Sequence, residues 1–227
     1  MIEPLVQALR LIFSGDREVY AIAFTSLRFS AASVVIGALL SLPLGFGLAF
    51  RRFRGRGFVL AVLHTLLAIP TVVVGLFVYS LISRAGPLGG LGLLFTPAAV
   101  VIGQTLLCLP LITSFTHGAL ARVDPRLGET LTTLGASRWD VFRMTLRECR
   151  VGILAAVLAG FGRVIGEVGV AMMLGGNIRW YTRTLTTAIA LETSKGEFEL
   201  GLALGLVLLV IAFAVNLALH GMVPHER

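Results

Sequence analysis

The sequence has few charged residues and only two cysteines, and it contains long apolar runs. Of its 227 residues, 14% are charged and 56% are hydrophobic, with a mean hydropathy of +0.92. A soluble core of this length cannot bury so much apolar surface, so the composition predicts a polytopic membrane protein with a single membrane domain. Cys108 lies in an apolar run and Cys149 beside a basic one, which indicates buried thiols rather than a disulfide.

Several motifs of enzymes and binding proteins are absent. There is no G-x-x-x-x-G-K-[ST] phosphate loop, so the chain is not expected to hydrolyse ATP itself. There is no Cys/His cluster at metal-ligand spacing, and the four histidines are scattered. We therefore predict no catalytic residues, no metal site and no cofactor bound by this chain. The net charge of +7 comes mostly from arginines in two loops, which argues against nucleic acid as a partner.

Five apolar segments predict an all-α membrane protein with five transmembrane helices. A kink is expected at Ile69-Pro70 inside the second segment. Residues 1–18 have apolar side chains at helical spacing, which indicates an amphipathic helix on the membrane surface ahead of a transmembrane domain at 19–222. The predicted spans cover residues 19–50, 58–82, 93–115, 151–174 and 200–222.

Arginines define the orientation in the membrane. The loop Arg51–Arg56 has four arginines and no acid, and the segment 122–150 has six arginines, so both are predicted to be cytoplasmic. Five spans then place the amino terminus outside and the carboxyl terminus in the cytoplasm, and residues 175–199 become an external loop. The expected location is the cell inner (plasma) membrane, in contact with lipid.

The segment Glu129–Arg147 is the longest polar interval between apolar runs. Leu131, Leu134, Arg138 and Phe142 follow one another at spacings of three and four, which predicts an irregular amphipathic helix with a break at Gly135. A solvated loop has no reason to carry aromatic side chains, whereas a segment that docks into a groove of another protein does. An ordinary amphipathic cytoplasmic loop is the alternative.

The fourth span contains two charged residues. Arg163 and Glu167 are four apart, so they share a helix face and can pair. A charge at membrane depth is costly and faces the protein interior or water. Either Arg163 and Glu167, with Gly166 and Gly169, line a translocation path, or they form a structural ion pair. Gly162 and Gly166 also form a small-x-x-x-small face that permits close approach of another helix.

The predicted external loop is rich in hydrogen-bond donors. Such donors suit a tetrahedral oxyanion, a docked protein partner, or plain solvation. Leu185–Leu191 is expected to form a short helix with Thr184 as its N-cap, and Gln104 in span three to make an interhelical hydrogen bond. The candidate external residues are Asn177, Arg179, Thr182, Arg183 and Thr184.

Two stretches resemble a known family. Glu129, with Gly135 six positions on and Met144 and Leu146 nine and eleven positions after Gly135, resembles the E-A-A-x-x-x-G and I-x-L-P motif of ABC importer permeases. The departures are Thr130 and Leu131 in place of the two alanines, Met144 in place of isoleucine and Arg147 in place of proline. In that family the segment is a cytoplasmic coupling helix seated in a cleft of the ATPase subunit. The resemblance thus implies a coupling role for Glu129, Gly135, Ala136, Ser137, Arg138, Trp139 and Phe142.

The second stretch narrows the resemblance. Arg163–Gly169 followed by Leu174–Asn177 is similar to the R-x-x-G-E-x-G-x-x-x-x-L-G-G-N span of molybdate and tungstate permeases, and residues 181–197 look most like the tungstate branch. This implies the type I importer transmembrane fold, alternating access driven by ATP on two copies of a partner ATPase subunit, and an extracellular or periplasmic solute-binding protein. Tungstate is the expected substrate; molybdate, sulfate or another small solute are alternatives.

Five spans are too few to enclose a path above two ATPase sites, so a homodimer is expected. Outside this class, a passive channel or a membrane scaffold would need no ATPase. A membrane enzyme is disfavoured because no catalytic constellation is present.

Overall fold

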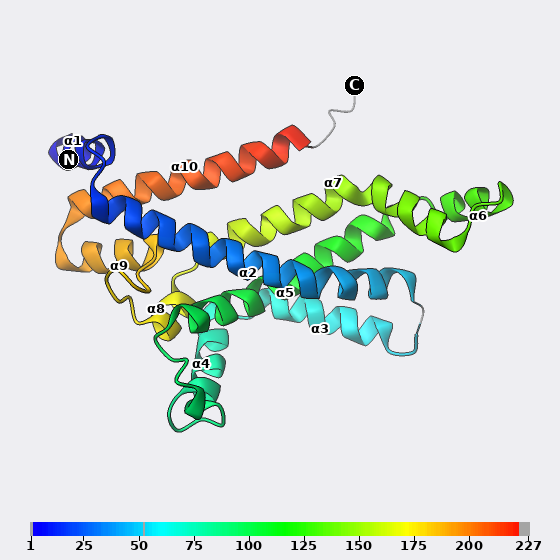
Figure 1. Ribbon diagram of the computed structural model, residues 1–227, viewed down its shortest axis with the longest axis horizontal. Coiled ribbons are helices and arrows are strands. Elements are labelled where there is room, and N and C mark those ends of the chain that lie inside the picture. Colours follow the sequence, from blue (N-terminus) through cyan, green and yellow to red (C-terminus); the bar gives the residue numbers. More distant parts are fainter. Residues whose placement is uncertain (1, 52, 223–227) are drawn as a thin grey trace.

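The computed structural model describes residues 2–51 and 53–222, which form α-helices and one short 3₁₀ turn, with no strand in this part of the chain (Figure 1). The elements are α1 (Ile2–Phe13), α2 (Arg17–Phe50), α3 (Arg56–Ala68), α4 (Thr71–Ile82), η1 (Gly89–Leu91), α5 (Pro97–Ala121), α6 (Pro125–Thr133), α7 (Arg138–Ile165), α8 (Gly169–Gly175), α9 (Leu185–Lys195) and α10 (Phe198–Met222).

The number of membrane-crossing elements agrees with the five predicted spans. Helices α2, α5 and α10 are long and apolar enough to cross a bilayer, and the bent pairs α3–α4 and α7–α8 bring the count to five if each pair is one span. The 34 residues of α2 correspond to about 51 Å, more than the roughly 30 Å of hydrocarbon. The all-α class is confirmed.

Helices α2, α5 and α7 form the centre of the molecule. Val34, Cys108, Ile112 and Ala156 are buried between them. Gln104 makes the expected interhelical bonds: its amide nitrogen donates to the Val164 carbonyl at 3.3 Å, and its amide oxygen accepts from the Ser33 hydroxyl at 3.0 Å. Both cysteines are free and buried, as predicted.

The amino-terminal helix α1 is present as predicted and packs on α10. Ala8 is fully buried in a cluster with Val19 and Leu204, whereas Phe13 is exposed. Asp16 then caps α2, because its carboxylate accepts from the backbone N–H groups of Glu18 and Val19 at 2.9 and 3.0 Å. The position of α1 on a membrane surface stays a prediction.

Two spans are broken helices. The kink expected at Ile69-Pro70 is a bend of 100° between α3 and α4. The prediction of one helix over 151–174 was wrong in shape. Helix α7 begins at Arg138, inside the predicted amphipathic segment, because Ser137 caps it, and it continues into the span because no proline follows. It ends at Ile165, and α8 begins at Gly169 after a bend of 62°.

The two basic segments lie at the same end of the molecule. In Figure 1 the connection between α2 and α3 and the α6–α7 corner are both on the right, whereas α1 and α9 are on the left. This arrangement is consistent with one cytoplasmic and one external end.

Two glycines of α2 give a matched test of the α2–α5 packing. A Cβ at Gly45 would lie 2.9 Å from the Thr116 Cβ and 3.2 Å from the Thr113 carbonyl oxygen, whereas a Cβ at Gly47 would meet nothing within 4 Å. We expect Gly45→Ala to lower the free energy of unfolding by about 1–3 kcal/mol through overpacking. Gly47→Ala should leave it unchanged or raise it slightly. Thermal unfolding of purified protein in detergent measures both, and equal melting temperatures would contradict the packing described.

Candidate functional site

A buried carboxylate lies in the gap between α7 and α8. The Glu167 side chain is 4% exposed, and its Oε2 accepts from the Arg163 Nη1 at 3.0 Å. Its Oε1 accepts from the backbone N–H of Val170 at 3.2 Å, so the same group caps the first turn of α8. The backbone carbonyl of Glu167 accepts from the Thr186 hydroxyl at 2.7 Å. The predicted pairing of Arg163 with Glu167 is therefore present, and it holds a helix break together.

The break between α7 and α8 lies against the break between α3 and α4. A Cβ at Gly169 would lie 3.1 Å from the Thr71 Oγ1 and 3.3 Å from the Val72 Cγ2 at the start of α4. Gly75 of α4 similarly faces Met173 of α8. Gly169, predicted to line a path, is thus a close-packing position between two half-helices.

The glycine face of α7 is open. Within the described part of the chain, a Cβ at Gly162 would meet nothing within 4 Å, and one at Gly166 would meet only the carbonyl oxygen of Gly162 at 3.9 Å. Arg163 has 36% of its side chain exposed beside this face. The small-x-x-x-small surface predicted from the sequence is therefore not used for packing within one chain.

The predicted coupling segment folds as two helices joined by a tight turn. Glu129 lies on α6, and Gly135 lies in the turn with φ +83°, a left-handed conformation that favours glycine. The break expected at Gly135 is confirmed. Ala136 and Ser137 are also in the turn, and α7 starts at Arg138, so the residues implied to be the centre of the coupling helix form the corner between two helices.

A capping box fixes this corner. The backbone N–H of Asp140 donates to the Ser137 hydroxyl at 3.2 Å, and the Ser137 N–H donates to the Asp140 Oδ2 at 3.1 Å. The hydrogen bonds from the side chain and backbone of Ser137 lower the pKa of Asp140. Because the folded pKa is the lower one, this contribution to stability is present at neutral pH and is lost only as the pH falls through that pKa.

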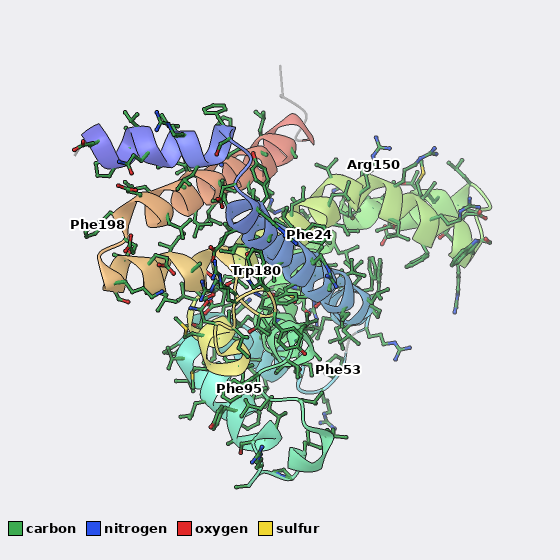
Figure 2. All side chains as sticks on the ribbon, turned by 60° about the vertical axis from the view of Figure 1, so that its left-hand side comes forward. Phe24, Phe53, Phe95, Arg150, Trp180 and Phe198 are labelled. Carbon is green, nitrogen blue, oxygen red and sulfur yellow. The ribbon has the colours of Figure 1, made fainter. Side chains whose placement is uncertain are left out.

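Large apolar side chains at the corner point to solvent. Leu134 is 78% exposed and Trp139 is 63% exposed. The rings of Trp139 and Phe142 stack with their centroids 5.4 Å apart. The Phe142 ring also packs against the rings of Phe46 and Phe50 of α2, with centroid distances of 6.0 and 6.2 Å. The corner therefore combines an exposed apolar surface with an aromatic contact to the membrane domain. Figures 1 and 2 show α6 and the start of α7, which carries Arg150, as an arm away from the other helices.

The predicted external loop is held by contacts within the chain. Arg179 forms a bidentate pair with Glu18 at 2.9 and 2.6 Å, and this hydrogen bonding raises the pKa of Arg179. Arg183 contacts Glu18 at 3.4 Å and Glu192 at 3.7 Å. Lys195 pairs with Glu192 at 3.1 Å. The loop thus ties the beginning of α2 to α9.

The polar side chains of this loop are also largely engaged. The Thr182 hydroxyl accepts from the Ile178 N–H at 3.0 Å and donates to the Gly175 carbonyl. Thr184 is the N-cap of α9, as predicted, in a capping box with Thr187. Asn177 donates to the Thr187 carbonyl at 3.3 Å. Few of these donors are available for an oxyanion.

Three groups in these networks were not anticipated. Glu18 is more than 160 positions from Arg179 and Arg183, whereas Glu192 follows Arg183 within the same loop, and Ser26 accepts from the Leu185 N–H at 2.6 Å. The only signal for Glu18 is its place as an acid at the external end of the first span. Figure 2 shows Trp180 beside α2, where the guanidinium of Arg17 lies 5.8 Å from its ring.

Comparison with known families identifies the class. Residues 41–225 match the family described as "Binding-protein-dependent transport system inner membrane component". The chain therefore belongs to this family, the permease subunits of ABC importers. The expected resemblance to the molybdate and tungstate type is confirmed by its relatives.

Three relatives are similar over most of their length. A tungstate uptake system permease protein, TupB, of Campylobacter jejuni is 42% identical, covering 94% of this chain and 90% of the relative. A probable anion ABC transporter permease protein of Haloferax volcanii is 42% identical, and the match covers 86% of this chain and 87% of the relative. A molybdenum transport system permease protein, ModB, of Azotobacter vinelandii is 31% identical, covering 91% and 94%.

Solved structures show the same fold at low sequence identity. The bacterial alginate ABC transporter matches with a TM-score of 0.74 and 18% identity, covering 98% of this chain and 88% of that one. The methionine ABC transporter MetNI matches with a TM-score of 0.69 and 19% identity, covering 92% and 95%. The fold is that of a type I ABC importer transmembrane domain.

The unequal burial of the two paired charges leads to a test. In Arg163→Met the buried carboxylate loses its counter-charge, and we expect a loss of about 3–5 kcal/mol in the free energy of unfolding. In Glu167→Gln the amide oxygen still accepts from the Val170 N–H and the partly exposed arginine can be hydrated, so the loss should be about 1–3 kcal/mol. The double variant should recover part of the loss. Thermal unfolding in detergent orders the three variants, and a larger effect of Glu167→Gln would contradict this geometry.

Proposed function

We propose that this chain is one half of a homodimeric permease that imports tungstate, driven by two copies of a separate ATPase subunit. The single observation that supports the energy coupling is the exposed apolar corner at Leu134 and Trp139, at the end of the molecule that carries the arginine-rich segments. Solvent-facing leucine and tryptophan at one corner fit a groove on another protein. Tungstate is favoured because the relative named as a tungstate permease is more similar than the molybdenum one.

The coupling step follows from the length of α7. Its 28 residues form one continuous helix of about 42 Å from the corner to the helix break. When ATP brings the two ATPase subunits together, each subunit moves the corner seated in it, and α7 carries that displacement to Arg163 and Glu167. ATP must therefore favour one of two packed arrangements of the helices, inward-facing or outward-facing.

The homodimer is supported by a glycine face of α7 that no other helix of the described chain covers. The open face at Gly162 and Gly166 permits close approach of a second helix. Arg163 and Glu167, next to this face, would then lie near the dimer axis. In this arrangement the exposed third of Arg163 presents guanidinium N–H groups toward a shared path, where an oxyanion is attracted while Glu167 limits how tightly it is held.

The external end would receive the anion from a solute-binding protein. Ile178, Trp180 and Tyr181 of the external loop are exposed, and the Arg179–Glu18 pair fixes the loop against α2. We infer that this rigid loop contributes to docking of the binding protein rather than contacting the anion with its threonines. The same orientation places the amino terminus outside and the carboxyl terminus in the cytoplasm.

The docking role of the corner is tested with two exposed leucines. We expect Leu134→Asp to weaken co-purification of the ATPase subunit by at least about tenfold, since a charge replaces an apolar anchor. Leu91→Asp, in the turn before α5, is the control because Leu91 is 64% exposed and far along the chain from the corner. Both variants should unfold at the wild-type temperature. Undiminished ATPase binding and uptake by Leu134→Asp would contradict the proposal, as would a wild-type permease that purifies without an ATPase subunit.

The substrate is tested by competition. Cells or proteoliposomes that contain the permease, the ATPase subunit and the binding protein should take up tungstate, and molybdate in excess should compete because the two tetrahedral dianions are alike in charge and shape. Sulfate at the same concentration should compete at least about tenfold less if tungstate is the substrate. Preferential competition by sulfate would reassign the permease to that anion. Uptake without ATP would indicate a passive channel.

A further inference from the structure

A large apolar cavity lies at the arginine-rich end of the molecule. It has a volume of about 1130 Å³ and is formed by the last turns of α2, by α3, and by Phe142 of α7. This is slightly above the roughly 300–1,000 Å³ of typical small-molecule sites. Most of the lining is aliphatic or aromatic, and the polar contributors are Arg51 and Thr113.

The cavity opens beside a cluster of positive charge. Arg51 is one of its lining residues, and the loop that follows contains four arginines and no acid between positions 51 and 56. Arg56 is turned away, because its Nε donates to the Leu48 carbonyl at 2.7 Å and its Nη2 contacts the His117 ring. The ion pairs found among the described residues lie elsewhere, at Glu18, Glu167 and Glu192. Arg51 is thus exposed at the rim of an apolar hollow.

We propose that this cavity holds an acyl chain of an anionic phospholipid from the cytoplasmic leaflet, with the lipid phosphate against Arg51. The apolar walls match the chain, and a juxtamembrane arginine cluster matches the headgroup charge. Phe50, Phe53 and Val59 line the cavity and are themselves partly exposed, so a chain can enter from the side of the bilayer. The proposal does not depend on which anion the permease carries.

The position of this lipid connects it with the coupling corner. Phe46, Phe50 and Phe142 line the cavity, and the same three rings join α2 to the start of α7. Trp139 stacks on Phe142 at 5.4 Å. A bound chain therefore packs against the joint between the membrane domain and the corner, and it limits how far α7 can move relative to α2.

Trp139 provides a reporter for the occupant. The chain has two tryptophans, so Trp180→Phe leaves Trp139 alone. The full-length Trp180→Phe protein is reconstituted in nanodiscs that contain phosphatidylglycerol or phosphatidylcholine with brominated acyl chains. At equal mole fraction, we expect brominated phosphatidylglycerol to quench Trp139 about twofold more, because the arginines concentrate the anionic lipid.

Matched variants locate the effect. Gly47 lines the cavity and Gly57 does not, yet a Cβ at either would meet nothing within 4 Å. Gly47→Phe should obstruct the cavity and reduce the excess quenching by phosphatidylglycerol, whereas Gly57→Phe should retain it. Arg51→Gln should reduce the preference for phosphatidylglycerol, and Arg84→Gln, in the turn after α4, should not.

Three results would overturn the proposal. Equal quenching by the two lipids would show that the headgroup is not recognised. Unchanged quenching in Gly47→Phe would place the lipid outside the cavity. Absence of quenching by either lipid would mean that protein, such as a second copy of the chain, covers the cavity instead.

Discussion

The buried carboxylate of Glu167 is the interaction on which the centre of this permease depends. It neutralises Arg163 and accepts from the Val170 N–H in the first turn of α8, and the backbone carbonyl of the same residue accepts from the Thr186 hydroxyl of α9. Backbone groups left unbonded within a membrane are costly, and a charge at that depth costs at least about 2.5 kcal/mol. One residue therefore meets three requirements of a broken helix: its carboxylate supplies a counter-charge and caps α8, and its backbone carbonyl anchors the junction.

The second broken helix completes this centre. The start of α4 packs so closely on Gly169 that a side chain there would press on Thr71 and Val72. The ends of α3 and α7 and the starts of α4 and α8 thus meet in one place. A few residues at the ends of helices can act as a hinge, because rearranging their backbone torsions requires no long helix to unfold.

The sequence was sufficient to predict the apolar spans, the bend at Pro70, the cap at Thr184 and the pairing of Arg163 with Glu167, because each follows from local chemistry or helical spacing. It did not predict the break at residues 166–168. In the sequence, Gly166 and Gly169 are equally compatible with a continuous helix, in which they are packing positions, and with a break. Only the contact of Gly169 with Thr71 in the structure distinguishes these two possibilities. The pairs of Glu18 with Arg179 and Arg183 join residues more than 160 positions apart, and no periodicity connects them. The exposure of Leu134 likewise depends on how the corner is placed in three dimensions.

Because α7 is one continuous helix, the directions in which its two ends face are fixed relative to each other. Each residue advances a helix by about 100°, so the direction in which the corner faces is fixed relative to that of the buried carboxylate by residue number alone. One inserted residue anywhere between Arg138 and Ile165 would turn the cytoplasmic face by about a quarter of a revolution, while seven would nearly restore it. Natural variation in the length of this stretch is therefore expected in whole helical repeats rather than in single residues.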